Sequence, residues 1–183
     1  MRRWVGCLLL LAILPIKAED LIDQLSVRAG AIDFMQGKFV LQRQISALPL
    51  PLESYGTFEY SKLKGINWKT LAPVVSLINI SEHGILSDDI QRHQVGTDQF
   101  AVALLGIFSG DLSGLQNQFS ISAIGSLDKW QLTLEPSNPA IAARIVNIRI
   151  SGAENTESIQ IEEANRDNTV INLVTDHIRA KGK

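Results

Sequence analysis

Apolar and polar residues alternate along several short stretches of the chain, and turn residues separate these stretches. Three apolar runs lie between Ser54 and Ile80, and each contains β-branched or aromatic residues. They comprise Thr57, Phe58 and Tyr60; Ile66 and Trp68; and Val74 to Ile80. Because Lys64-Gly65 and Ala72-Pro73 divide them at short intervals, they predict three consecutive antiparallel strands. Trp68 is then expected to pack against the inside of a curved sheet.

The same periodicity predicts further strands on both sides of this meander. A long strand from Ile32 to Ile45 would place Phe39, Leu41 and Ile45 on one face. After residue 129, strict alternation is typical of half-buried antiparallel strands. These strands contain Trp130, Leu132 and Leu134; Val146, Ile148 and Ile150; Ile159 and Ile161; and Thr169 to Val174. A weaker strand or hairpin is expected from Ile85 to Val95.

Two segments have helical rather than strand periodicity. From Glu19 to Ala29, apolar side chains recur at three- and four-residue spacing, and Gly30 provides a stop. A second helix is expected to begin at Thr97-Asp98 and to end at Gly110. One side of that helix carries Phe100, Ala101, Leu104, Leu105 and Phe108. Leu112 to Phe119 is expected to add a short helical turn.

The N-terminal residues have the pattern of a secretory signal peptide. Arg2 and Arg3 precede an apolar run from Trp4 to Ile16, and the small residue Ala18 follows. The run is too short to cross a bilayer stably, although an uncleaved anchor is the alternative. We expect cleavage after Ala18, which divides the chain into a signal peptide, residues 1–18, and one exported domain, residues 19–183.

Composition narrows the class of partner for this exported domain. The single cysteine, Cys7, belongs to the predicted signal peptide, so stability must come from a hydrophobic core rather than a disulfide. Loss of three basic residues with the signal peptide leaves 14 basic against 19 acidic side chains, a net charge of about −5. An acidic surface argues against binding to nucleic acid and against tight binding to anionic lipid surfaces.

Residues with catalytic or metal-binding patterns are scarce. His93 beside Asp88 and Asp89 is the best metal candidate, but its spacing differs from that of zinc sites. No nucleophile motif, phosphate-binding loop or dinucleotide fingerprint is present. We therefore predict no catalytic residue, no metal and no cofactor, and the enzyme hypothesis is the minor alternative.

The meander also resembles a known family. Matching residues occur in the same order and spacing at Gly56, Phe58, Asn67, Trp68, Pro73 and Gly84. In this pattern the chain is similar to the periplasmic outer-membrane lipoprotein carrier family, LolA-like proteins, which share their fold with the receptor LolB. Lys62-Leu63 stands where the family has an Arg-Pro turn, so the chain resembles a divergent member.

The resemblance implies a mainly β fold with an α-helical lid. A single curved antiparallel sheet, an unclosed half-barrel, would carry helices on its concave face, and an N-terminal helix would lie across its mouth. The apolar cavity and lid would comprise Phe39, Leu41, Phe58, Tyr60, Trp68, Phe100, Leu104, Leu105, Phe108, Trp130, Leu132 and Leu134. Lys62, six residues before Trp68, would latch the lid by bonding its backbone, with Lys64 as a second candidate.

The same resemblance implies a function as a carrier in the periplasm of a Gram-negative cell. The chain, expected to be a monomer, would receive the acyl chains of lipoproteins, or another lipid, from an inner-membrane transporter and pass them to an outer-membrane receptor. Burying each methylene of such a guest is worth about 0.8 kcal/mol. Strand patterning leaves two alternatives open, a cavity or a solid core, and a lipid-processing or lipid-sensing role is the other functional hypothesis.

Overall fold

The computed structural model describes residues 18–87 and 97–181, and in these residues the chain forms one antiparallel sheet with four helices. The strands are β1 (Ile32–Gln44), β2 (Leu52–Ser61), β3 (Gly65–Ala72), β4 (Ser76–Ser81), β5 (Gly84–Ser87), β6 (Phe119–Ser126), β7 (Lys129–Pro136), β8 (Ile145–Gly152), β9 (Thr156–Glu163) and β10 (Asn168–Ala180). The helices are α1 (Ala18–Gly30), α2 (Thr97–Ser109), α3 (Leu112–Gln116) and α4 (Pro139–Ala142).

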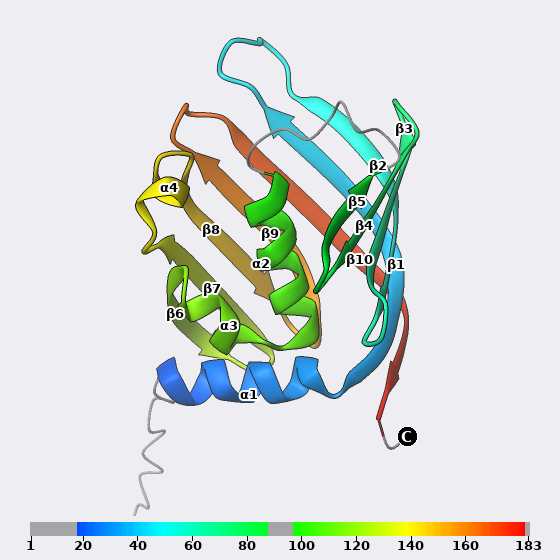
Figure 1. Cartoon of the computed structure of the whole chain (residues 1–183), viewed down its shortest axis with the longest axis vertical. Helices are drawn as coiled ribbons and strands as arrows, with labels where there is room; N and C mark the ends of the chain where they lie inside the picture. Colours follow the sequence, from blue (N-terminus) through cyan, green and yellow to red (C-terminus); the bar gives the residue numbers. More distant parts are fainter. Residues whose placement is uncertain (1–17, 88–96, 182–183) are drawn as a thin grey trace, which may run out of the picture.

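The ten strands lie in the order β5-β4-β3-β2-β1-β10-β9-β8-β7-β6. The first and last strands of the chain, β1 and β10, pair with each other at the centre and so join two meanders. Helices α2 and α3 carry the chain from the edge strand β5 to the opposite edge strand β6 (Figure 1). The sheet is curved but not closed into a barrel, which confirms the predicted fold class.

Alternation along the strands gives the sheet one apolar face. In β7, Trp130, Leu132 and Leu134 are buried, whereas Gln131 and Thr133 between them are only half-buried. This period of two is the one expected for strands that bury a single face. The buried face is concave, and α2 lies against it, while α1 lies across the lower end of the sheet (Figure 1). Both helices therefore occupy the places that the family resemblance implies.

Two reciprocal pairs of phenylalanine and glycine shape the concave face. Phe39 pairs across the strands with Gly56, and Phe58 pairs with Gly37. A side chain on Gly56 would come within 2.8 Å of the Phe39 ring, and one on Gly37 would come equally near the Phe58 ring. Each ring therefore lies over the neighbouring strand, in space that a β-carbon would fill.

The structure corrects several element boundaries. Strand β6 was not predicted, and only its first residue fell within a segment expected to be helical. The last strand runs to Ala180 instead of Val174, because its polar second half pairs with the start of β1. Val74 and Val75 precede β4 as exposed turn residues. The strand expected from Ile85 appears as β5 up to Ser87, and the remainder of that segment lies outside the described residues.

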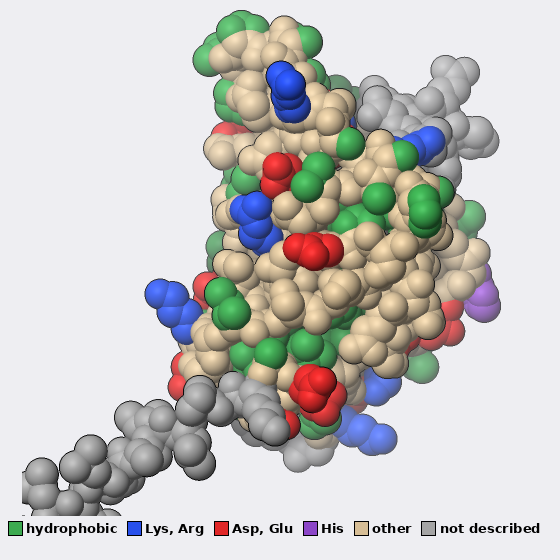
Figure 2. Space-filling view, turned by 90° about the vertical axis from the view of Figure 1, so that its left-hand side faces the viewer, with side chains coloured by type: hydrophobic (Ala, Val, Ile, Leu, Met, Phe, Trp, Pro, Cys, Tyr) green, Lys and Arg blue, Asp and Glu red, His purple; other side chains and the backbone are tan. Residues whose placement is uncertain are grey.

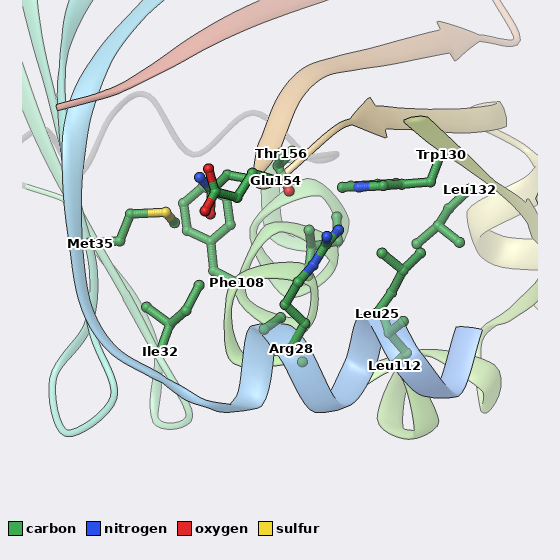
Figure 3. A pocket seen from close by; sticks show the side chains of 14 residues that line it. Leu25, Arg28, Ile32, Met35, Phe108, Leu112, Trp130, Leu132, Glu154 and Thr156 are labelled. Atoms are coloured by element: carbon green, nitrogen blue, oxygen red, sulfur yellow. The ribbon is translucent and has the colours of Figure 1, made fainter. Parts of the chain in front are cut away.

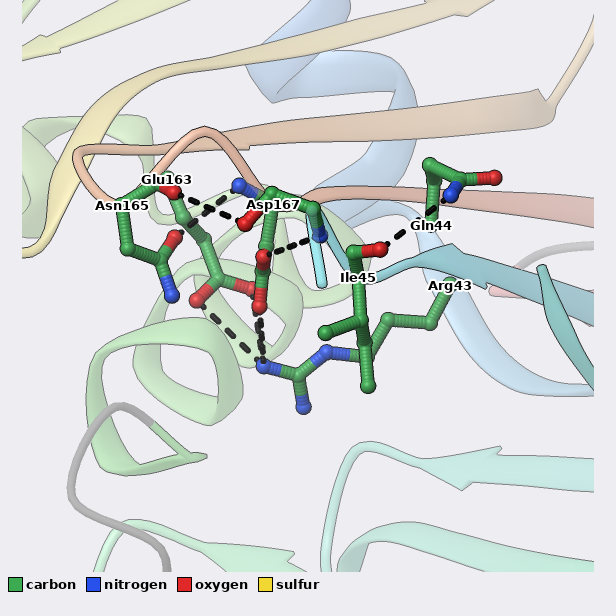
Figure 4. Close-up of polar contacts among 7 residues, drawn as sticks. Arg43, Gln44, Ile45, Glu163, Asn165 and Asp167 are labelled. Carbon is green, nitrogen blue, oxygen red and sulfur yellow. Dashed lines mark hydrogen bonds and ion pairs between the residues drawn. The ribbon is translucent and has the colours of Figure 1, made fainter. Parts of the chain in front are cut away.

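A polar cluster ties the β9–β10 turn to the end of β1 (Figure 4). Arg43 Nη2 lies 3.3 Å from Glu163 Oε1 and 3.6 Å from Asp167 Oδ2. The buried Asp167 carboxylate also accepts a 2.9 Å hydrogen bond from the backbone N–H of Ser46. This backbone bond, helped by bonds from the Ser46 and Asn165 side chains and by the Arg43 charge, lowers the pKa of Asp167, although burial opposes it.

We expect Asp167→Asn to flatten the acid limb of the stability profile. A depressed folded-state pKa stabilises the fold above the unfolded-state pKa, and the stabilisation disappears as pH falls through the folded-state value. The variant should therefore be less stable than the wild type at pH 7, with a smaller difference at pH 2.5. Urea unfolding at both pH values measures this. Asp176→Asn, which alters an exposed pair with Lys38, is the control, and an unchanged pH profile for Asp167→Asn would contradict the prediction.

Candidate functional site

Helix α2 closes on a cluster of aromatic rings in the concave face. The Phe39 and Trp68 rings stack with centroids 3.9 Å apart, and Phe58 lies 6.3 Å from Trp68. Phe108 of α2 contacts this cluster, with its centroid 5.6 Å from Phe58 and 6.0 Å from Tyr60 in an edge arrangement. Burial, together with the nearby charges of Asp33 and Glu82, raises the pKa of Tyr60, so its hydroxyl stays neutral at physiological pH.

The structure brings the predicted apolar residues together in one core. Those with buried side chains are Phe39, Phe58, Tyr60, Trp68, Leu104, Phe108, Trp130, Leu132 and Leu134. Leu41 and Leu105 are partly buried and pack against the same core, whereas the side chain of Phe100 lies outside the described part. Sequence reasoning missed Met35 and Ile107, which are also buried there. Ile107 was detectable, since it lies three residues after Leu104 on the same helix.

In the described residues, the pocket between the concave face and α2 is small. The apolar pocket next to α2 has a volume of about 40 Å³. Sites that enclose a whole small ligand are usually 300–1,000 Å³. Of the two alternatives left by the sequence, the described residues favour a packed core with a pocket too small to enclose an acyl chain.

This pocket lies at the lower end of the sheet, between α1, the C-terminal end of α2 and the ends of several strands (Figure 3). Its walls are apolar and include Leu25, Ile32, Met35, Phe108, Trp130 and Leu132. Its remaining lining is polar and comes from Arg28 of α1 and from Glu154, Asn155 and Thr156 at the β8–β9 turn. Apolar walls with a few polar groups are the usual composition of a ligand pocket.

Arg28 ties α1 to two strand turns beside the pocket. Its Nη1 donates to Leu127 O at 2.9 Å, and its Nη2 donates to Ala153 O at 2.8 Å. The same Ala153 oxygen accepts a 2.7 Å bond from Trp130 Nε1. Burial lowers the pKa of Arg28, whereas the charges of Asp128 and Glu154 raise it, and the guanidinium stays protonated. No local sequence signal indicates these bonds, because they join positions about a hundred residues apart.

The ends of α1 and α2 meet at a glycine. Ser26 Oγ donates a hydrogen bond to Gly110 O. Gly110 has φ = +74°, and a β-carbon there would overlap Ser26 O and lie 2.6 Å from Gly30 N. Only glycine adopts this backbone without strain and also leaves room for α1. The C-terminal end of α2 is therefore fixed to α1.

Comparisons with known proteins agree with the resemblance seen in the meander. Residues 99–171 match the family model described as outer membrane lipoprotein carrier protein LolA-like. The predicted resemblance is confirmed over this segment, which is similar to LolA-like proteins. The matched segment begins in α2 and ends in β10, outside the meander on which the sequence-based resemblance depended. No curated protein matches the chain significantly.

The solved structures that match the chain are distant in sequence. The LolA superfamily protein NE2245 from Nitrosomonas europaea has 8% identity and a TM-score of 0.47, with 92% of this chain and 95% of that chain covered. The MucA/MucB complex of Pseudomonas aeruginosa gives 13% identity and a TM-score of 0.43, with 90% and 59% covered. A DUF1329 family protein from Desulfovibrio piger gives 8% identity and a TM-score of 0.39, with 91% and 95% covered. The LolA-like assignment rests on the sequence match.

The predicted latch residue reaches α1. Lys62 Nζ donates a 2.9 Å hydrogen bond to Gly30 O, the last residue of α1, although the resemblance implied a bond to the lid backbone. Gly30 lies beside Gly110, where α2 ends. Lys62 therefore holds the helix end on which α2 rests, and any latching of α2 acts through α1.

We expect substitutions of Lys62 to change how often α2 opens. One charge-assisted bond from an exposed side chain is worth about 1 kcal/mol, so Lys62→Leu should speed hydrogen exchange in residues 101–109 and increase access of an acyl probe. Lys62→Arg should do the opposite, because a guanidinium can hold more than one carbonyl. Lys64→Leu is the control from the same turn. If both Lys62 variants match the wild type in exchange and probe access, Lys62 is not a latch.

The described residues show neither the pattern of a metal site nor that of a membrane-spanning helix. They contain no group of three His, Cys, Asp or Glu side chains that could hold a metal. His83 and His177 are exposed, and the metal candidate formed by His93, Asp88 and Asp89 falls outside the described range. Among the described helices, none combines the length and the apolar character needed to cross a membrane.

Proposed function

We propose that this LolA-like protein is a periplasmic carrier that binds acyl chains of lipoproteins, or of another lipid, between α2 and the concave face of the sheet. The observation that carries the proposal is the apolar character of α2 on nearly all sides. Leu104 and Phe108 face the sheet, Val102 is 43% exposed, and no charged residue follows Asp98 in the helix. A helix without a polar face is unusual at a protein surface and suits a cover that leaves its place to an apolar guest.

Binding is reversible in this proposal because the free energy gained by burying the acyl chain is offset by the cost of displacing α2. At about 0.8 kcal/mol per methylene, a chain of about 12 carbons gains on the order of 10 kcal/mol by burial. Moving α2 away exposes Leu104, Ile107 and Phe108, which costs about 1.5–3 kcal/mol for each side chain. The difference of about 1–6 kcal/mol leaves a weak and readily reversible affinity, which suits a carrier that must release its cargo.

Two solution measurements test this proposal together. A fluorescent fatty acid should bind saturably, and hydrogen exchange in residues 101–109 should rise in the bound state while exchange in β7 and β8 stays slow. Absence of saturable binding, or binding with α2 unchanged, would oppose the carrier mechanism. A panel of ester substrates tests the enzyme alternative, because a carrier releases no product from them.

We also infer export by way of a signal peptide at residues 1–18. The exported protein should begin at Glu19, because the basic start and the apolar run precede Ala18 as signal peptidase requires. N-terminal sequencing of periplasmic material checks this. An intact Met1 in the membrane fraction would indicate an anchored protein instead. In the proposed cycle the protein is a monomer. It receives its cargo from an inner-membrane transporter and passes it to an outer-membrane receptor.

On the face that contains the edge strand β6, hydrophobic side chains are scattered among polar atoms and charged side chains (Figure 2). Ile124 of β6 is 65% exposed, yet single exposed apolar residues are ordinary on soluble proteins. This face therefore offers no continuous apolar surface, whereas the side chains buried between the sheet and α2 are apolar, which supports a guest held inside.

A further inference from the structure

The two halves of the sheet separate at the lower end of the molecule. Strand β9 pairs with β10 from Ser158, opposite Asn172, to Glu162. Beyond Asn172, β10 continues to Ala180 along β1, whereas β9 has no residues there, because it begins at Thr156 after the turn from β8. The β1–β10 pair thus leaves the β8–β9 turn at this end, and the sheet divides there.

Helix α1 lies across this division and is bonded to both halves. On one side Gly30 O accepts the Lys62 bond from the β2–β3 turn. On the other side Arg28 bonds Leu127 O and Ala153 O, in the β6–β7 and β8–β9 turns. The small apolar pocket lies between these attachments, lined by Ile32 and Met35 from one half and by Trp130 and Leu132 from the other (Figure 3).

The pocket connects the surface with the core under α2. Phe108 belongs both to the pocket lining and to the aromatic cluster of Phe58 and Tyr60. At about 40 Å³ the pocket has room for the end of a single chain but not for a whole lipid. An acyl chain advancing past Phe108 would reach the place that α2 occupies.

The rim of the pocket carries both signs of charge. The Arg28 guanidinium has five N–H donors, and its two carbonyl bonds use two of them, so donors remain for an anionic oxygen as far as the described residues show. Exposed carboxylates at Glu154 and Asp128 lie close enough to act on the Arg28 charge. A purely anionic head group would meet two carboxylates, whereas a zwitterionic one has a partner for each of its charges.

We propose that this division of the sheet is the port through which a single acyl chain enters, and that its rim selects an amphiphile with a zwitterionic phosphate–ammonium head group. Arg28 binds the phosphate, Glu154 and Asp128 attract the ammonium, and the chain passes between Met35 and Trp130 toward Phe108. The inference rests on the proposed acyl-binding function and adds to it a route and a class of head group.

The route is tested by filling the port. Ala29→Phe places a ring in the pocket lining and should slow the association of dodecylphosphocholine several-fold, with the indole signal of Trp130 shifted. Val27→Phe is the matched control, because Val27 is 76% exposed on the same helix. Thr156→Phe fills the port from the opposite side. It replaces Ala29→Phe in this test if Ala29→Phe fails to fold. If the filled variants bind as fast as the wild type does, the port lies elsewhere although acyl binding stands.

The head-group selectivity is tested with three amphiphiles of equal chain length, each below its micellar concentration. Wild-type protein should bind dodecylphosphocholine more tightly than laurate or dodecyltrimethylammonium. Glu154→Gln should weaken dodecylphosphocholine binding by about two- to fivefold, the range of an exposed ion pair, and should strengthen laurate binding. Glu157→Gln, an exposed neighbour outside the pocket lining, is the control.

The outcomes separate the two proposals. Equal affinity for the three head groups, or a Glu154→Gln variant with unchanged preference, overturns the zwitterionic rim and leaves the carrier function intact. Failure of all three amphiphiles to bind the wild type removes the proposed function itself, and the port with it.

Discussion

Replacing Leu104 by Glu is expected to release α2 from the concave face while the sheet stays folded. Leu104 is fully buried, and a carboxylate there would lie among apolar side chains without a partner. An unpaired buried charge costs several kcal/mol, so movement of the helix into solvent becomes the less costly arrangement. Hydrogen exchange in residues 101–109 should become fast, and exchange in β7 and β8 should remain slow. Affinity for a fluorescent fatty acid should fall, because the new carboxylate lies on the side of α2 that faces the apolar guest.

Val102→Glu is the matched control for this variant. Val102 lies two residues earlier on the same helix and is 43% exposed, so a carboxylate there stays hydrated and should leave exchange and binding close to the wild-type values. If Leu104→Glu unfolds the whole sheet, α2 cannot leave the concave face without unfolding the protein, and the prediction is wrong. If it changes neither exchange nor binding, α2 is not the cover of the site.

Trp68→Ala is expected to give the largest loss of stability among single substitutions in the aromatic cluster. The indole is 6% exposed, stacks on Phe39 at 3.9 Å and lies 6.3 Å from Phe58. Truncating a buried Trp to Ala costs about 3–5 kcal/mol, because the transfer free energy is lost and a cavity remains. Urea unfolding followed by circular dichroism measures the change in the free energy of unfolding.

Tyr55→Ala supplies the comparison, since Tyr55 lies in the adjoining strand β2 and is 53% exposed. A surface truncation there should change the free energy of unfolding by no more than about 0.5 kcal/mol. Similar losses in the two variants would mean that Trp68 is not a centre of the packing. We further expect the Trp68→Ala variant to bind acyl probes more tightly than the wild type does, because the substitution leaves an apolar cavity in the concave face.

Much of this architecture was predictable from local sequence patterns. Alternation in β7 and β8 and helical spacing in α1 and α2 placed these elements correctly, since each buries one face and its sequence shows this directly. Strand β6, with the sequence FSISAIGS, was not predicted, because its serines, alanine and glycine give little alternation between apolar and polar residues. The polar second half of β10 was not predicted to be a strand, because it pairs with β1, which is far away in the sequence.

The site was predicted in part. The described apolar residues assigned to the cavity and lid gather in one core, because the alternation that predicts a strand also predicts its inward face. Whether that core is solid, and where Arg28 and Lys62 bind, depends on distances between separate elements. Backbone carbonyls such as Ala153 O and Gly30 O leave no signature in the sequence, so the attachments of α1 could be seen only in three dimensions.

The most direct test of the carrier account is paramagnetic broadening by an acyl chain that carries a nitroxide at its terminal carbon. The account predicts saturable binding with strong broadening of the Trp68 indole N–H, because Trp68 is buried and packs against Phe58, which contacts Phe108 of α2. The amides of Val40 and Tyr55, whose side chains are on the opposite face, should broaden less. Saturable binding that spares Trp68 and broadens Val40 and Tyr55 would contradict a guest held inside the half-barrel.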